Sequence, residues 1–254
     1  MANDGTRNDG ASNDGAKNDG ASNDGAKGGG GNEARAMTGA VAEVLAAVQA
    51  GDAARLESAL KAHPEAAGAR DAGGVSATML ALYRGRKDLA AKLAEMPGQL
   101  DIFEAASLGR VWRIRDILKT EPDAANRWSG DGFTALHFAS FFGQEEAALA
   151  LLEHGANPCA VARNGMKVMP LHSAATARSL PIVRALLENG ADANAPQEKG
   201  WRAIHSAAQN GDSAMVEELL KYGADPRAAS DDGTTAAQLA AAKGHAELAE
   251  RLKT

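Results

Sequence analysis

Apolar positions in the second half of the chain repeat at helical spacing. Residues 203–210, AIHSAAQN, are small, apolar or good helix formers, and Gly211 follows them directly. The next segment places its apolar side chains three and four residues apart, as on one face of a second helix: Met215, Val216, Leu219 and Leu220. Gly223 then ends that helix. The pattern predicts a unit of two short helices joined by a glycine turn.

The same unit recurs along the chain. Arg178 fills the one turn where glycine is missing, and the other turns carry Gly51, Gly85, Gly109, Gly143, Gly211 and Gly244. The steps between these positions are 34, 24, 34, 35, 33 and 33 residues, which predicts seven stacked units. Because such short helices are not stable alone in water, each unit must bury its apolar face on its neighbours. We therefore expect an all-α repeat solenoid over residues 38–254, with its clearest units in residues 130–254.

Two connections depart from the regular spacing. The step of 24 shortens the connection near residues 96–98, which should lack a projecting hairpin and change the stacking locally. The connection around Met166, Lys167 and Val168 carries two extra residues and should bulge. Asp-Gly and Asn-Gly pairs in the connections should supply the positive φ angles of tight turns, at Gly132, Gly165 and Gly233.

These motifs resemble the ankyrin repeat, whose unit reads G-x-T-P-L-H-x-A-A, then a glycine, a leucine-rich helix and G-A-D-x-N. The matching segments are GFTALHFAS with EHGAN, MPLHSAA with ENGADANA, WRAIHSAAQNG with KYGADPRA, and GTTAAQLAAAKGHAEL. The resemblance implies helix-turn-helix units joined by hairpin-like loops. It also implies a protein-binding scaffold without chemistry of its own.

The first residues of the chain have a different composition. Residues 1–31 contain no Val, Leu, Ile, Phe, Tyr or Trp, and the motif NDG recurs every five residues before a run of glycines. Such a segment has nothing to bury against the entropy of ordering it, so residues 1–37 are expected to form a disordered tail and linker. Calcium loops alternate oxygen ligands and end in a bidentate Glu, which this spacing does not provide.

Composition excludes several function classes. No apolar run approaches the length of a membrane span, and a net charge of -6 does not provide the broad basic surface that nucleic acid requires. The single Cys159 cannot form an internal disulfide, which favours a reducing compartment. We expect a cytoplasmic monomer that binds no nucleic acid, membrane or cofactor.

Three histidines occupy the same place in successive units: His137, His172 and His205. Neighbouring helices lie about 8 to 10 Å apart, whereas two ligands of one zinc ion lie within about 4 Å of each other. A nucleophile and its base need similar proximity, and no Ser or Cys is spaced to supply it. The rings are therefore predicted to be neutral structural groups that bond backbone atoms of their own or the next loop, rather than metal ligands or catalytic residues.

One basic run also has both a structural and a functional interpretation. GRVWRIRDILK places Arg110, Arg113 and Arg115 around Trp112. The apolar residues of this run have helical spacing, so the arginines are expected on the solvated side. An acidic protein partner and nucleic acid are the other two interpretations of this run.

The binding surface of a repeat array varies between units at the loop tips and at the ends of the first helices. Those places hold Tyr83, Arg84, Ser107, Leu108, Phe133, Phe141, Phe142, Met166, Thr176, Trp201, Gln209 and Asn210. For Phe141 or Phe142, a place in the core is the alternative. We expect a non-enzymatic interaction scaffold that binds an unidentified protein through its concave face and loop tips. An inhibitor or chaperone of a cognate enzyme is the alternative, followed by a small-molecule or metal-binding protein.

Overall fold

The computed structural model describes residues 29–96 and 100–253, with side chains from residue 36 onward. The NDG tail up to residue 28, and residues 97–99 of the short connection, lie outside this part of the chain. Within it, fourteen α-helices form seven pairs: α1 (Gly29–Ala50) and α2 (Ala53–Ala62), α3 (Ala77–Tyr83) and α4 (Lys87–Ala94), α5 (Ile102–Ser107) and α6 (Val111–Thr120), α7 (Ala135–Phe141) and α8 (Glu145–Glu153), α9 (Pro170–Thr176) and α10 (Leu180–Glu188), α11 (Ala203–Gln209) and α12 (Ser213–Lys221), α13 (Ala236–Ala242) and α14 (Ala246–Arg251).

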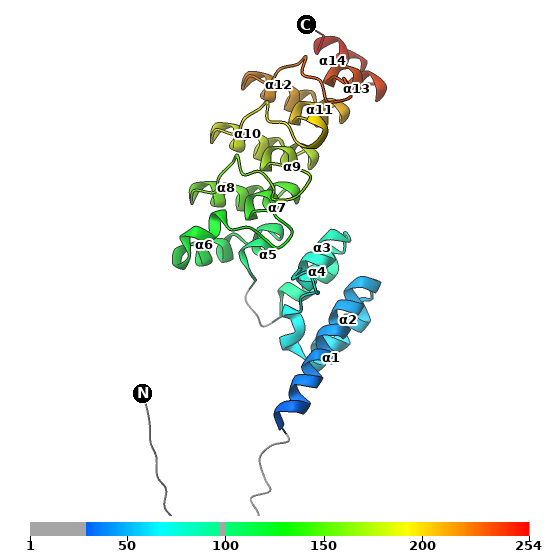
Figure 1. Ribbon diagram of the computed structural model, residues 1–254, viewed down its shortest axis with the longest axis vertical. Helices are drawn as coiled ribbons and strands as arrows, with labels where there is room; N and C mark the ends of the chain where they lie inside the picture. The colour runs from blue at the N-terminus through cyan, green and yellow to red at the C-terminus, as the bar shows by residue number, and fades with distance from the viewer. Residues whose placement is uncertain (1–28, 97–99, 254) are drawn as a thin grey trace, which may run out of the picture.

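The pairs stack one on the next from the blue end of the chain to the red end (Figure 1). From α5 onward, the first helices of the pairs form one row and the second helices another. All six marker glycines lie in the turn between the two helices of a pair and have positive φ. Arg178 takes the same backbone conformation, with φ 57°, at the seventh turn. The predicted seven-unit helical solenoid is confirmed.

A continuous apolar core runs through the stack. Each of the first six pairs contributes fully buried leucine, isoleucine or methionine side chains, among them Leu56, Leu89, Ile114, Leu136, Leu171, Ile204 and Met215. The first helices contribute alanines with no exposed surface, such as Ala139, Ala174 and Ala207. Small side chains let neighbouring first helices approach closely, so the few aromatic residues of this chain are not needed to fill the interior.

The connections between pairs fold back as short hairpins. Isolated antiparallel bridges close three of them, at Arg70 with Ser76, Trp128 with Thr134, and Ala229 with Thr235. Gly132 and Gly233 have positive φ as expected. The prediction for Gly165 is wrong, because Lys167 holds the left-handed conformation there, with φ 51°. The two extra residues of this connection move the left-handed position from the Asn-Gly pair to a later residue.

The first helix of the stack crosses the predicted boundary between tail and array. Helix α1 starts at Gly29, before the expected boundary at residue 38, and continues through Ala36 and Met37, which are good helix formers. None of the helices in the described part of the chain is long and apolar enough to span a bilayer.

The solvated-face prediction for the basic run holds for Arg110 and Arg115 but not for Arg113. Val111 to Thr120 form helix α6, and Trp112 points outward with 69% of its surface exposed. The Arg113 side chain is only 11% exposed, and its Nε donates to the Leu100 carbonyl at 2.9 Å. This arginine therefore links α6 to Leu100, at the end of the short connection, instead of facing water.

Candidate functional site

The three histidines close the start of their helices. In His172, Nδ1 accepts the backbone N–H of Met169 at 3.0 Å, and Nε2 lies 2.8 Å from the Ala195 carbonyl in the next connection. Because one nitrogen accepts and the other donates, the ring is neutral, with its proton on Nε2. Each ring thus links the N-terminus of its own helix to the following hairpin, as predicted.

His137 and His205 repeat this geometry. His137 Nδ1 accepts the N–H of Thr134 at 3.2 Å and its Nε2 lies 3.0 Å from the Val168 carbonyl. His205 joins the N–H of Arg202, at 3.0 Å, to the Ala228 carbonyl, at 3.1 Å. The Thr134 hydroxyl lies 2.8 Å from the His137 ring rather than capping a backbone N–H.

Burial opposes protonation of these rings. It lowers the pKa of His137 from 6.5 to about 4, and it also lowers the pKa values of His172 and His205. The backbone carbonyls that accept hydrogen bonds from Nε2 raise the pKa values, but by less than burial lowers them. Within residues 29–96 and 100–253, no group of three or more His, Cys, Asp or Glu side chains is arranged to hold a metal ion.

An apolar groove lies beside these histidines. Its volume is about 340 Å³, and its walls come from α3, α7, α9 and the hairpins between them. The lining residues are Tyr83, Phe133, His137, Phe138, Phe141, Met166, Val168, His172, Ser173, Thr176 and Gln197. The two histidine rings in this wall are neutral, so the wall carries no charged side chain.

The short connection explains why Tyr83, from the second pair, reaches a groove formed mainly by the fourth and fifth pairs. Only seven residues separate Ala94 of α4 from Ile102 of α5, whereas fourteen separate Thr120 of α6 from Ala135 of α7. With no room for a hairpin there, the hairpins on either side meet: a Cβ at Gly130 would lie 3.4 Å from the Gly73 carbonyl oxygen. The Tyr83 hydroxyl therefore reaches Asp131 and donates a hydrogen bond to its carboxylate.

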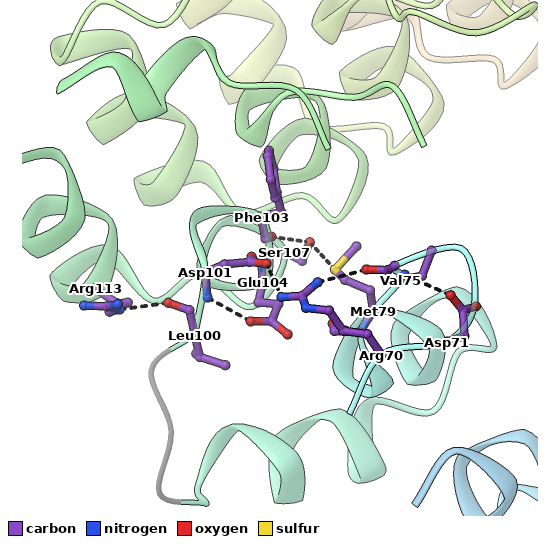
Figure 2. Close-up of polar contacts among 12 residues, drawn as sticks. Arg70, Asp71, Val75, Met79, Leu100, Asp101, Phe103, Glu104, Ser107 and Arg113 are labelled. Atoms are coloured by element: carbon purple, nitrogen blue, oxygen red, sulfur yellow. Dashed lines mark hydrogen bonds and ion pairs between the residues drawn. The ribbon is translucent and has the colours of Figure 1, made fainter. Parts of the chain in front are cut away.

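Polar contacts join the hairpin before α3 to the start of α5 (Figure 2). Arg70 spans the junction, pairing with the Asp101 carboxylate at 2.8 Å and donating to the Gly74 carbonyl at 3.0 Å. Asp101 also accepts the Glu104 N–H, and Glu104 accepts the Asp101 N–H, each at 2.8 Å. Burial, and then the nearby Asp101 charge, raise the pKa of Glu104. The stack continues across this junction, but the α1–α2 and α3–α4 pairs are turned relative to the later pairs (Figure 1).

The structure brings five of the predicted surface residues together in the groove wall: Tyr83, Phe133, Phe141, Met166 and Thr176. The described wall residues do not include the other predicted ones, Arg84, Leu108, Phe142, Trp201, Gln209 and Asn210. Leu108 and Phe142 are partly buried against the core, and Trp201 packs on the His205 ring at 5.6 Å. Ser107 is buried, and its hydroxyl donates to the Phe103 carbonyl at 2.8 Å.

Sequence reasoning missed the floor of the groove. Phe138 lies there with 4% of its surface exposed, in edge-on contact with Phe103 and Phe133. The available signal was a large ring at a position where the following units carry Ser173 and Ser206. The expected binding surface covers only loop tips and the ends of first helices, so it does not include Phe138.

Comparison with known proteins places this architecture in a family. A family model described as "Ankyrin repeats (3 copies)" matches residues 102–197 and 171–253. The chain is also 32% identical over 107 residues to BCL-6 corepressor-like protein 1 of Homo sapiens, a match that covers 42% of this chain and 6% of that relative. Members of the ankyrin repeat family are generally non-enzymatic protein-interaction modules. The helix pairs, the hairpin connections and the family match agree, and the chain belongs to the ankyrin repeat family.

Proposed function

We propose that this protein is a non-enzymatic, cytoplasmic scaffold or adaptor that binds a protein partner at the groove between α7 and α9. The observation that carries the proposal is the gathering of exposed apolar side chains at one hollow. Tyr83, Phe141 and Met166 line the groove with 45%, 51% and 45% of their surfaces exposed, in a chain with only 4% aromatic residues. Exposed aromatic side chains around a pocket commonly anchor protein interfaces.

The state of the groove histidines supports binding rather than catalysis. A general base needs a nitrogen that can take a proton from a substrate. In His137 and His172 one ring nitrogen already accepts a backbone N–H, and the other donates to a carbonyl. These rings shape the wall of the groove and leave its surface apolar.

Affinity capture from the native lysate tests the proposal with a matched pair of variants. Phe141→Ser removes an exposed ring inside the groove, and Trp112→Ser removes an exposed ring on α6, outside the groove wall. Both side chains are more than half exposed, so both variants should fold with little change in melting temperature. We expect the wild type and Trp112→Ser to capture the same partner and Phe141→Ser to lose it. If both variants capture the partner equally well, the groove is not the binding site.

A further inference from the structure

Cationic residues adjoin the apolar groove along the chain. Arg84 directly follows the wall residue Tyr83, and Lys167 directly follows Met166. Arg178 lies two residues after the wall residue Thr176, and Lys199 lies two residues after Gln197. All four cations are exposed, and none forms an ion pair with the described residues.

Few negative charges compensate these cations at the groove. Asp131 is the acidic residue bound to the groove wall, and its carboxylate already accepts hydrogen bonds from Tyr83 and from the Ser129 hydroxyl. Glu198, beside Lys199, is exposed and contributes one negative charge. Although the protein as a whole has a net charge of -6, the residues that adjoin this groove are predominantly positive.

The backbone at three of these cations is unusual. Lys167, Arg178 and Lys199 are all the non-glycine residues with positive φ in the described part of the chain. Lys167 stands where the other hairpins have Gly74, Gly132, Gly200 and Gly233, each with positive φ. Side chains are strained in this conformation, and glycine avoids that strain. Three strained positions therefore carry cationic side chains next to one groove.

We infer that the groove binds an extended, acidic segment of the partner protein, with one large apolar side chain in the groove and aspartate or glutamate residues against Arg84, Lys167, Arg178 and Lys199. This inference rests on the proposed function and adds the chemistry of the partner. A volume of about 340 Å³ between aromatic walls suits one large apolar side chain. The aspartate or glutamate carboxylates of the partner segment pair with the four cations, which form no ion pair with the described residues of this protein.

Selection from a displayed library of random twelve-residue peptides, with the full chain as bait, tests this chemistry. We expect the selected peptides to combine one large apolar residue with nearby Asp or Glu residues. The best of them should bind more weakly as salt is raised, because exposed charge pairs are screened. Selected peptides that bind at the groove but show no enrichment in acidic residues would overturn the inference.

A variant that removes three of the charges and also relieves backbone strain can distinguish a loss of binding from a loss of folding. The triple variant Lys167→Gly, Arg178→Gly, Lys199→Gly should keep or raise the melting temperature and weaken the acidic peptide about tenfold. Lys243→Ala is the control, because Lys243 occupies the place of Arg84 at the end of α13, in the last unit. Full affinity in the triple variant would contradict the acidic segment and leave the proposed function intact. A library that yields no binder would contradict the extended acidic segment alone, whereas peptides that bind Phe141→Ser as tightly as the wild type would contradict both.

Discussion

The hydroxyl of Tyr83 donates to the carboxylate of Asp131, 48 residues further along the chain and two units away in the stack. Burial, followed by this hydrogen bond, raises the pKa of Tyr83 well above its ordinary value, so the phenol stays protonated as the donor. The bond ties the end of α3 to the hairpin before α7, past the short connection that leads into the third unit. It also holds one wall of the groove in position.

Removing this hydroxyl should loosen the junction. We expect Tyr83→Phe to lower the free energy of unfolding by about 0.5 to 1.5 kcal/mol, because one solvent-exposed hydrogen bond is lost while the ring is retained. Urea denaturation measures the change. Tyr222→Phe, which alters a tyrosine of the sixth unit, is the control and should stay close to the wild type. A Tyr83→Phe variant as stable as this control would show that the bond contributes nothing.

The linking role of the histidines predicts different effects for two substitutions of one ring. His172→Ala leaves the Met169 N–H and the Ala195 carbonyl without their partner, so it should destabilise the protein by about 1 to 3 kcal/mol. Glutamine can accept the same N–H, as Gln238 Oε1 does from Thr235 at 2.8 Å in the last unit. His172→Gln should therefore recover part of the loss in denaturant unfolding. Metal released from the purified wild type would instead indicate a ligand role.

The depressed pKa values of the rings predict loss of stability in mild acid. The unfolded chain binds a proton at each ring near pH 6.5, whereas folded His137 resists protonation down to about pH 4. The free energy of unfolding therefore falls as pH is lowered through this window, and His137 alone accounts for about 2 kcal/mol between about pH 7 and about pH 5. Denaturant unfolding as a function of pH measures the slope. A slope that is the same in the wild type and in His137→Gln would exclude this ring as its source.

The left-handed backbone of Arg178 predicts a stabilising substitution. Arg178→Gly should raise the free energy of unfolding by about 1 kcal/mol, because glycine adopts positive φ without the steric strain of a side chain. Gly143→Ala is the converse change at the equivalent turn, where φ is 68° and an added Cβ would meet no atom within 4 Å. It should destabilise by a similar amount through the backbone alone. Changes of the same sign in the two variants would refute this reasoning.

A buried hydroxyl in α7 predicts a second stabilising change. Ser140 has no exposed surface, and its Oγ lacks a hydrogen-bond partner within the described residues. The corresponding positions of the next units hold alanine, at Ala175 and Ala208. Ser140→Ala should raise the free energy of unfolding by about 1 kcal/mol, because it removes a buried polar group that has no partner. A lower melting temperature in this variant would show that the hydroxyl is bonded in solution.

Local sequence signals were enough to predict the helix pairs and their turns. Glycine spacing and the apolar face of each second helix depend on neighbouring residues only, so Arg178 could be placed in a turn from its position in the repeat. The histidine bonds could also be expected, since a ring near the start of a helix lies close to unpaired backbone groups.

The groove itself depends on contacts between distant units and could not be derived in this way. Tyr83 enters its wall because two hairpins meet over the short connection, a result of three-dimensional stacking. The left-handed Lys167, instead of Gly165, depends on how two extra residues are absorbed within a hairpin. The five surface residues that gather there were identifiable individually, but their common site was visible only in the fold.

The seven-residue connection between Ala94 and Ile102 is also expected to divide the protein into two units of unfolding. In a repeat array, each unit is stabilised by its interface with the next, so unfolding is cooperative only where neighbouring interfaces are strong. This connection is half the length of the one before α7, and the interface beside it includes bonds such as those of Arg70 and Tyr83. We therefore expect two cooperative blocks, α1 to α4 and α5 to α14, and we expect the first to open to amide exchange without unfolding of the second.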